Sequence, residues 1–155
     1  MRLTNTTDIH NDIIREVLRF VRPPGISNFD VRVSNTARGI AGTAYTKGSS
    51  YHDRACPFVV LRIGKTGWPS GELPPHRPGY RGVPSLANKV EALVFLAAHE
   101  LRHLWQARGV RRGRAKGSRG SGMSEWDADT YAYEKLAEWR AATTTSPLSL
   151  PHLLK

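Results

Sequence analysis

The hydrophobic positions near the start of the chain follow a helical spacing. Four apolar residues recur at intervals of three or four positions: Ile9, Ile13, Val17 and Phe20. This spacing predicts an amphipathic helix, and Thr7 or Asp8 can cap its amino end. Two prolines and a glycine at residues 23–25 end the helix, because proline cannot continue it.

The pattern then changes to alternation, which is typical of strands. In FDVRVS, the apolar Phe29, Val31 and Val33 alternate with polar residues, so we expect a strand with one buried face. A turn over residues 35–39 leads to GIAGTAY, a glycine-loosened segment that we expect to be its antiparallel partner. PFVVLRI, residues 57–63, is β-branched and mostly apolar, and it predicts a third strand.

A segment crowded with proline and glycine separates these strands from two further helices. Residues 64–85 have no periodic apolar face and predict a loop, either a lid or binding loop or a surface excursion. Ser85 can cap the next helix, which runs to about Gln106 and is apolar on most sides, as a buried central helix is. A last helix is predicted from near Ser124 to about Ala141.

Together these elements predict an α+β fold with a small, mainly antiparallel sheet of three or four strands. A chain of 155 residues is the size of one domain, which we place at residues 1–142, followed by a tail at 143–155. The N-terminus is polar, and no run of about 18 apolar residues occurs, so we expect a cytoplasmic or otherwise intracellular protein without membrane contact. The single cysteine excludes an internal disulfide.

The charge is strongly basic, with 23 Lys and Arg against 13 Asp and Glu and a net charge of +10. Part of this excess lies in a glycine-rich segment, residues 107–122, which we expect to be a loop. Its basic residues are Arg108, Arg111, Arg112, Arg114, Lys116 and Arg119. Such residues between glycines suit contact with nucleic acid or another polyanion. The same residues could instead bind an acidic protein or stay solvated.

Candidate chemistry lies on the predicted central helix. His99 and His103, in HELRH, are four residues apart, so both imidazoles lie on one helix face within reach of one metal ion. Glu100 is rotated by about 100° from His99 and borders such an ion, where a general base belongs. The alternative is a pair of core histidines without metal. Buried histidine and glutamate side chains are unfavourable without partners, which favours the metal site.

A catalytic zinc site needs a third protein ligand and keeps one position for water. The last predicted helix begins with SEWDAD, in which Glu125 and Asp129 share a face. Packed against the histidine helix, Glu125 could complete a His₂Glu set, and Asp129 could hold the free ring N–H of a ligating histidine. Alternatively, Glu125 only interacts with the helix dipole, with Asp127 as the next-best ligand, and Asp129 forms an ordinary salt bridge.

HELRH followed by EWDAD resembles the gluzincin class of zinc metallopeptidases, which carry H-E-x-x-H and then E-x-x-x-D on the next helix. EWDADTYA is also similar to the E-x-E-A-D-x-F-A run of small ImmA/IrrE-type metallopeptidases, with Asp127 for the second acidic residue and Tyr131 for the aromatic. The resemblance implies a minimal zincin-like fold and hydrolysis of peptide bonds in a protein or peptide substrate. It implies one Zn²⁺ per chain bound by His99, His103 and Glu125, Glu100 as general base, and Asp129 hydrogen-bonded to a ligand.

Three alternatives stay open at the level of the sequence. The residue that steadies the oxyanion could be Tyr80, Tyr133, His76 or His152. Either PFVVLRI or GIAGTAY could be the sheet edge along which a peptide substrate pairs. The rival function is a basic binding module, nucleic-acid-associated or regulatory, whose metal site is structural or degenerate.

Overall fold

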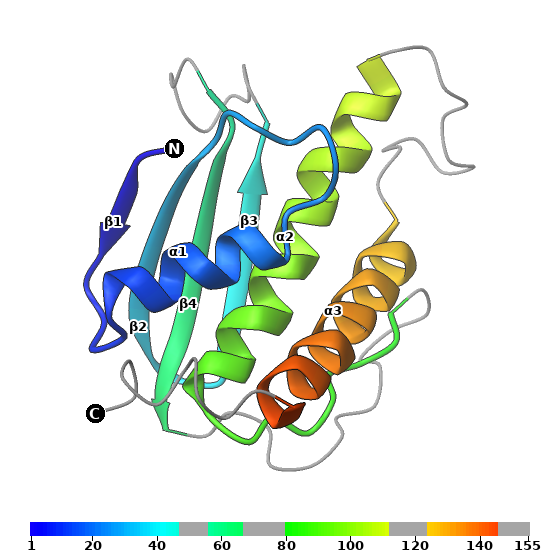
Figure 1. Cartoon of the computed structure of the whole chain (residues 1–155). Helices are drawn as coiled ribbons and strands as arrows, with labels where there is room; N and C mark the ends of the chain where they lie inside the picture. The colour runs from blue at the N-terminus through cyan, green and yellow to red at the C-terminus, as the bar shows by residue number, and fades with distance from the viewer. Residues whose placement is uncertain (47–55, 67–79, 112–123, 146–155) are drawn as a thin grey trace.

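The fold is a mixed sheet with helices packed on one face (Figure 1). The computed structural model describes residues 1–46, 56–66, 80–111 and 124–145. In chain order the elements are β1 (Leu3–Asn5), α1 (Asn11–Phe20), β2 (Asp30–Arg38), β3 (Ile40–Tyr45), β4 (Phe58–Thr66), α2 (Lys89–Arg111) and α3 (Glu125–Thr145). The prediction of an α+β fold is confirmed.

The strand pairing differs from the mainly antiparallel sheet that we predicted. The order is β1-β2-β4-β3, with β2 parallel to both β1 and β4, and β3 antiparallel to β4. After β2 the chain turns at Gly39, whose φ is 66°, and returns along the other edge of β4. GIAGTAY therefore pairs with PFVVLRI and not with FDVRVS. The interior place of β4 fits its nearly continuous run of apolar residues.

The polar N-terminus forms a strand, β1, that the hydrophobic pattern did not predict. Between β1 and α1 the chain turns around Asn5, whose Oδ1 accepts hydrogen bonds from the N–H and the hydroxyl of Thr7 (2.8 and 2.7 Å). Asp8 forms an ion pair with Lys89 of α2 (2.6 Å). Because Thr7 and Asp8 are engaged in these contacts, α1 starts later than predicted, with His10 as its cap.

The amino ends of the two long helices are capped by polar side chains. Asn88, and not Ser85, caps α2, because its Oδ1 accepts the N–H groups two and three residues further on (2.9 and 3.0 Å). The helix extends beyond its predicted end, so residues 107–111 of the expected basic loop are helical. α3 begins at Glu125, next to the predicted start near Ser124, and the hydroxyl of Ser124 caps it by accepting the N–H of Asp127 (3.1 Å). This helix includes residues 143–145, which we had assigned to the tail.

The hydrophobic core lies between the sheet and helices α1 and α2, and α3 packs on α2. The three inward residues predicted for FDVRVS are each at most 1% exposed: Phe29, Val31 and Val33. The middle of α2 is buried on nearly all sides, as its composition predicted. Its buried apolar residues are Ala92, Leu93, Val94, Phe95, Leu96, Ala97, Ala98, Leu101 and Leu104. A polar side chain on this helix therefore lies close to the core.

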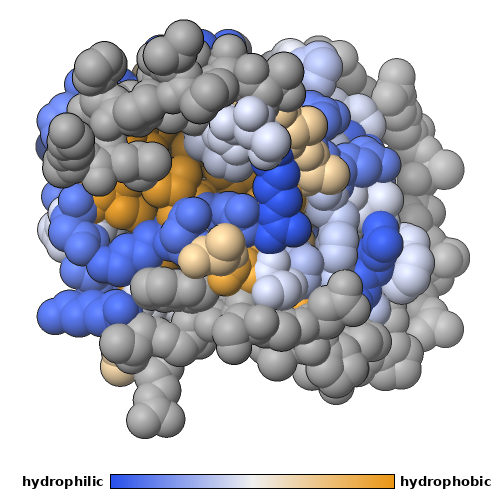
Figure 2. Space-filling model, turned by 60° about the horizontal axis from the view of Figure 1, so that its bottom comes forward, coloured by the Kyte–Doolittle hydropathy of each residue, from blue (hydrophilic) through white to orange (hydrophobic). Residues whose placement is uncertain are grey.

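The described surface is mostly hydrophilic in the view of Figure 2, where hydrophobic residues show in a recess between hydrophilic ones. Within the described residues, Met1 and Trp126 are the large hydrophobic side chains that are exposed. None of the helices in the described part of the chain has the length and apolar character needed to cross a membrane.

Candidate metal centre

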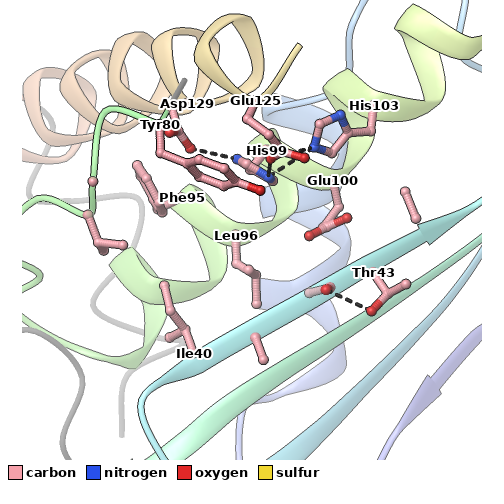
Figure 3. Close-up of a pocket in the computed structure, with 15 residues that line it drawn as sticks. Ile40, Thr43, Tyr80, Phe95, Leu96, His99, Glu100, His103, Glu125 and Asp129 are labelled. Atoms are coloured by element: carbon pink, nitrogen blue, oxygen red, sulfur yellow. Dashed lines mark hydrogen bonds and ion pairs between the residues drawn. The ribbon is translucent and has the colours of Figure 1, made fainter. Parts of the chain in front are cut away.

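Two helices bring three potential metal ligands together. His99 and His103 lie one turn apart on α2, and Glu125 is the first residue of α3, which packs along α2 (Figure 3). The two Nε2 atoms are 3.0 Å apart. Oε2 of Glu125 lies 3.3 Å from Nε2 of His99 and 3.2 Å from Nε2 of His103. One ion could therefore be bound by all three atoms.

The spacing of these three atoms fits a small tetrahedral ion. With bonds of ~2.0–2.1 Å, the donor atoms of a tetrahedral zinc site lie about 3.3 Å apart. The observed separations are 3.0–3.3 Å. Two imidazoles and one carboxylate are also a donor set of catalytic zinc sites, in which water takes the fourth position. The spacing of the three atoms and their chemical types are therefore both compatible with a tetrahedral metal site.

Asp129 fixes the ring of His99. Oδ1 of Asp129 lies 2.9 Å from Nδ1 of His99, and Oδ2 accepts the backbone N–H of Arg81 (2.7 Å). An ionised carboxylate can only accept hydrogen bonds, so Nδ1 carries a proton and faces away from the cluster. Asp129, which is 4% exposed, therefore orients a potential ligand and ties the chain at Arg81 to α3.

Gln106, which the sequence pattern did not predict as a site residue, holds the ring of His103 in the same way. Its Oε1 lies 3.0 Å from Nδ1 of His103 and accepts the N–H of Ser124 (3.2 Å). Its Nε2 donates to the carbonyl of Ser124 and to Asp127 (2.9 and 2.7 Å), which fixes the orientation of the amide. The sequence does contain an indication of this role. Gln106 lies three positions after His103 on a helix predicted to be buried, where a polar side chain needs hydrogen-bond partners.

Both rings therefore turn Nε2 towards the carboxylate of Glu125. Three lone-pair atoms this close repel one another unless a cation lies between them. Burial lowers the pKa of His99, but hydrogen bonds to Asp129 and Glu125 outweigh it and raise the pKa to about 9. Contacts with His103 and His99 hold the pKa of Glu125 well below its usual range. The cluster is therefore arranged to hold positive charge, as a proton or as a metal ion.

Glu100 shares a pocket of about 500 Å³ with the cluster. Its side chain is 5% exposed and points from α2 towards β3 (Figure 3). Burial raises the pKa of its carboxyl, against the opposing effect of His99 and His103. A carboxylate with a raised pKa is a stronger base than one in water. Glu100 can therefore accept a proton close to the cluster.

The other walls of the pocket are mostly apolar. β3 contributes Ile40 to Ala44, α2 contributes Phe95 and Leu96, and the chain before α2 contributes Tyr80, Gly82 and Val83. The end of the predicted 64–85 loop thus borders the site, although residues 64–66 belong to β4. Residues 67–79 of that loop lie outside the described residues.

Among the four candidates for steadying an oxyanion, Tyr80 lines the pocket, and its hydroxyl end points towards the cluster in Figure 3. Tyr133 packs edge-on against Phe95, with 5.6 Å between the ring centres. His76 and His152 lie outside the described residues. The arrangement therefore favours Tyr80.

Asp127, the alternative ligand, is engaged elsewhere. Its carboxylate accepts Nε–H and Nη2–H of Arg102 (2.7 and 2.9 Å) and the amide of Gln106. The guanidinium of Arg102 also lies 4.0 Å from the ring centre of Trp105. These contacts join α2 to the first turn of α3, which carries Glu125.

Most of the predicted polyanion contacts lie outside the described residues. Arg108 is exposed near the carboxyl end of α2, and Arg111 is the last residue of that helix. The others lie beyond the described part of the chain: Arg112, Arg114, Lys116 and Arg119.

Comparisons of the chain with protein-family models, with curated proteins and with solved structures found no match. A functional proposal therefore depends on the geometry of the cluster and its pocket.

Proposed function

We propose that the protein is a zinc-dependent metallopeptidase that binds one Zn²⁺ through His99, His103 and Glu125. One observation carries the proposal: three donor atoms converge at tetrahedral spacing while Asp129 and Gln106 occupy the outer nitrogens of both rings. Three protein ligands are typical of catalytic zinc, whereas structural zinc sites have four. The pocket beside the cluster gives a substrate access to it.

Zinc bound here would supply a water of lowered pKa and polarise the carbonyl of the peptide bond. Glu100 takes the proton of the attacking water and delivers it to the nitrogen of the leaving amine as the C–N bond breaks. Its burial suits both steps, because a raised pKa lets the carboxyl accept and return a proton closer to neutral pH. The Tyr80 hydroxyl is our candidate for a hydrogen bond to the developing oxyanion.

The pocket walls suggest how a peptide binds. β3 is the edge strand of the described sheet that lines the pocket, so an extended peptide can pair along it. The alternative edge, PFVVLRI, is the interior strand β4 and is paired on both sides. Val83, Phe95 and Leu96 give the pocket an apolar wall that favours an apolar side chain next to the cleaved bond.

Hydrolysis of a peptide library, read by mass spectrometry, tests this proposal. We expect zinc-loaded wild type to cleave next to apolar residues. Glu100→Gln should keep its zinc and lose activity by about 10²–10⁴-fold, the usual contribution of a general base. The control Glu134→Gln changes an exposed glutamate of α3 and should remain active. A zinc-loaded wild type that cleaves no peptide, or a fully active Glu100→Gln, contradicts the proposal.

A further inference from the structure

β3 passes very close to the Glu100 side chain at Gly42. A Cβ atom added to Gly42 would lie 2.6 Å from both Cγ and Cδ of Glu100 and would also overlap its Oε1. Carbon atoms in favourable contact are ~3.5–4.0 Å apart. The Glu100 side chain therefore occupies the space that any side chain at position 42 would need.

The backbone itself does not require glycine at this position. Among the described residues, φ is positive at Gly25, Gly39 and Gly82, and Gly42 is not one of them. Gly39 is the opposite case, because its φ is 66° while nothing lies within 4 Å of an added Cβ. Glycine also weakens a strand through its conformational entropy. What distinguishes position 42 is the approach of Glu100.

We propose that Gly42 is a positioning residue for Glu100. Ile40 and Ala44, its neighbours on the same face of β3, pack against the core, and Gly42 leaves a slot between them. The Glu100 side chain fills this slot and is 5% exposed. The backbone of β3 thereby sets the position of the carboxylate in the pocket. The catalytic consequence rests on the proposed function, whereas the steric relation does not.

Gly42→Ala should displace the carboxylate of Glu100 without removing a potential zinc ligand. We expect one zinc per chain, a KM close to that of wild type and a kcat lowered by about 10²-fold, the usual cost of misplacing a catalytic group by ~1 Å. A variant that is damaged more generally would also lose zinc or raise KM.

A stability cycle tests the steric relation without any activity. The denaturant midpoint of the chelated protein is measured with and without Gly42→Ala in three backgrounds: wild type, Glu100→Gln and Glu100→Ala. Glutamine keeps the shape of glutamate, whereas alanine lacks the overlapping atoms. We expect Gly42→Ala to lower the midpoint in the first two backgrounds and to raise it in the third, because alanine is favoured over glycine where it fits.

Gly39→Ala is the matched control. Its penalty comes from a positive φ, so it should lower the midpoint equally in all three backgrounds. Equal shifts for Gly42→Ala in all backgrounds overturn the proposal, as does a wild-type kcat in Gly42→Ala. If the single variant Gly42→Ala does not fold, the double variant with Glu100→Ala must fold. A double variant that does not fold also overturns the proposal. If the cycle behaves as expected but wild type cleaves no peptide, the proposed function fails and the positioning of Glu100 stands.

Discussion

Each histidine ring of the cluster is held by an oxygen atom at its Nδ1, on the side away from Glu125. Oδ1 of Asp129 and Oε1 of Gln106 accept from the outer ring nitrogens, which leaves both Nε2 atoms facing Glu125. Such contacts fix the tautomer of a ligating histidine and make it a stronger metal ligand.

Gln106→Leu tests whether the amide supports metal binding. Loss of the bond to His103 frees that ring to rotate, so we expect zinc affinity to fall by about 10–100-fold. Competition with a chromophoric chelator measures the affinity, and Glu134→Gln serves as the control. An affinity unchanged by Gln106→Leu would show that the bond does not orient a ligand.

The stability of the metal-free protein should depend on pH through His99 and Glu125. The pKa of His99 is raised from 6.5 to about 9, so its contribution is full below pH 6.5 and is lost as the pH rises through 9. The pKa of Glu125 is lowered from 4.5, so its contribution is full above pH 4.5 and is lost below it. Thermal unfolding in the presence of a chelator should therefore give the highest melting temperature between pH 4.5 and pH 6.5.

The matched variant for this pH profile is His99→Ala. The decline in its melting temperature between pH 6.5 and 9 should be smaller than that of wild type, because the titrating imidazole is gone. An equal decline in both proteins would assign the pH dependence to other groups.

At the scale of elements, the contact between α2 and the start of α3 places Glu125. Arg102 donates two hydrogen bonds to Asp127, which also accepts from Gln106. The Arg102–Asp127 pair joins the first turn of α3 to α2, the helix that carries both histidines. The position of Glu125 therefore depends on Arg102 and Asp127, which are not among the three potential ligands.

Asp127→Ala should lower the free energy of unfolding by about 1 kcal/mol, since the pair is partly exposed. Zinc should bind more weakly but still at one per chain, because Glu125 loses support and no ligand is removed. Lys135→Ala, which breaks an ion pair within α3, is the control. Urea unfolding and zinc titration check both effects. Zinc binding as tight as in wild type would show that Asp127 does not support Glu125.

Local patterns in the sequence predicted the three helices and the strands β2, β3 and β4. α1 shows helical spacing and β2 shows alternation, whereas α2 and β4 are recognised by their nearly continuous apolar composition. The sheet order could not be read in this way. β2 pairs directly with β4, with Val31 opposite Val59, although β3 lies between them in the sequence. The turn at Gly39 does not specify whether β3 pairs with β2 or with β4. β1 has three residues, too few to show a period.

At the scale of the whole molecule, the site lies where the sheet, α2 and α3 meet. Helix geometry alone put His99 and His103 on one face, so the sequence predicted their proximity. Gly42 and Tyr80 reach the same pocket from β3 and from the chain before α2, and such contacts depend on the fold. Zinc binding and peptide hydrolysis remain predictions.

The metal content of protein purified without a metal-affinity step tests the central claim most directly. Elemental analysis should find about one zinc per chain in wild type and none in His103→Ala. His10→Asn, which replaces an exposed histidine with another good helix cap, should keep the zinc. A wild type that contains no metal, and takes up none when zinc is added, would contradict the account.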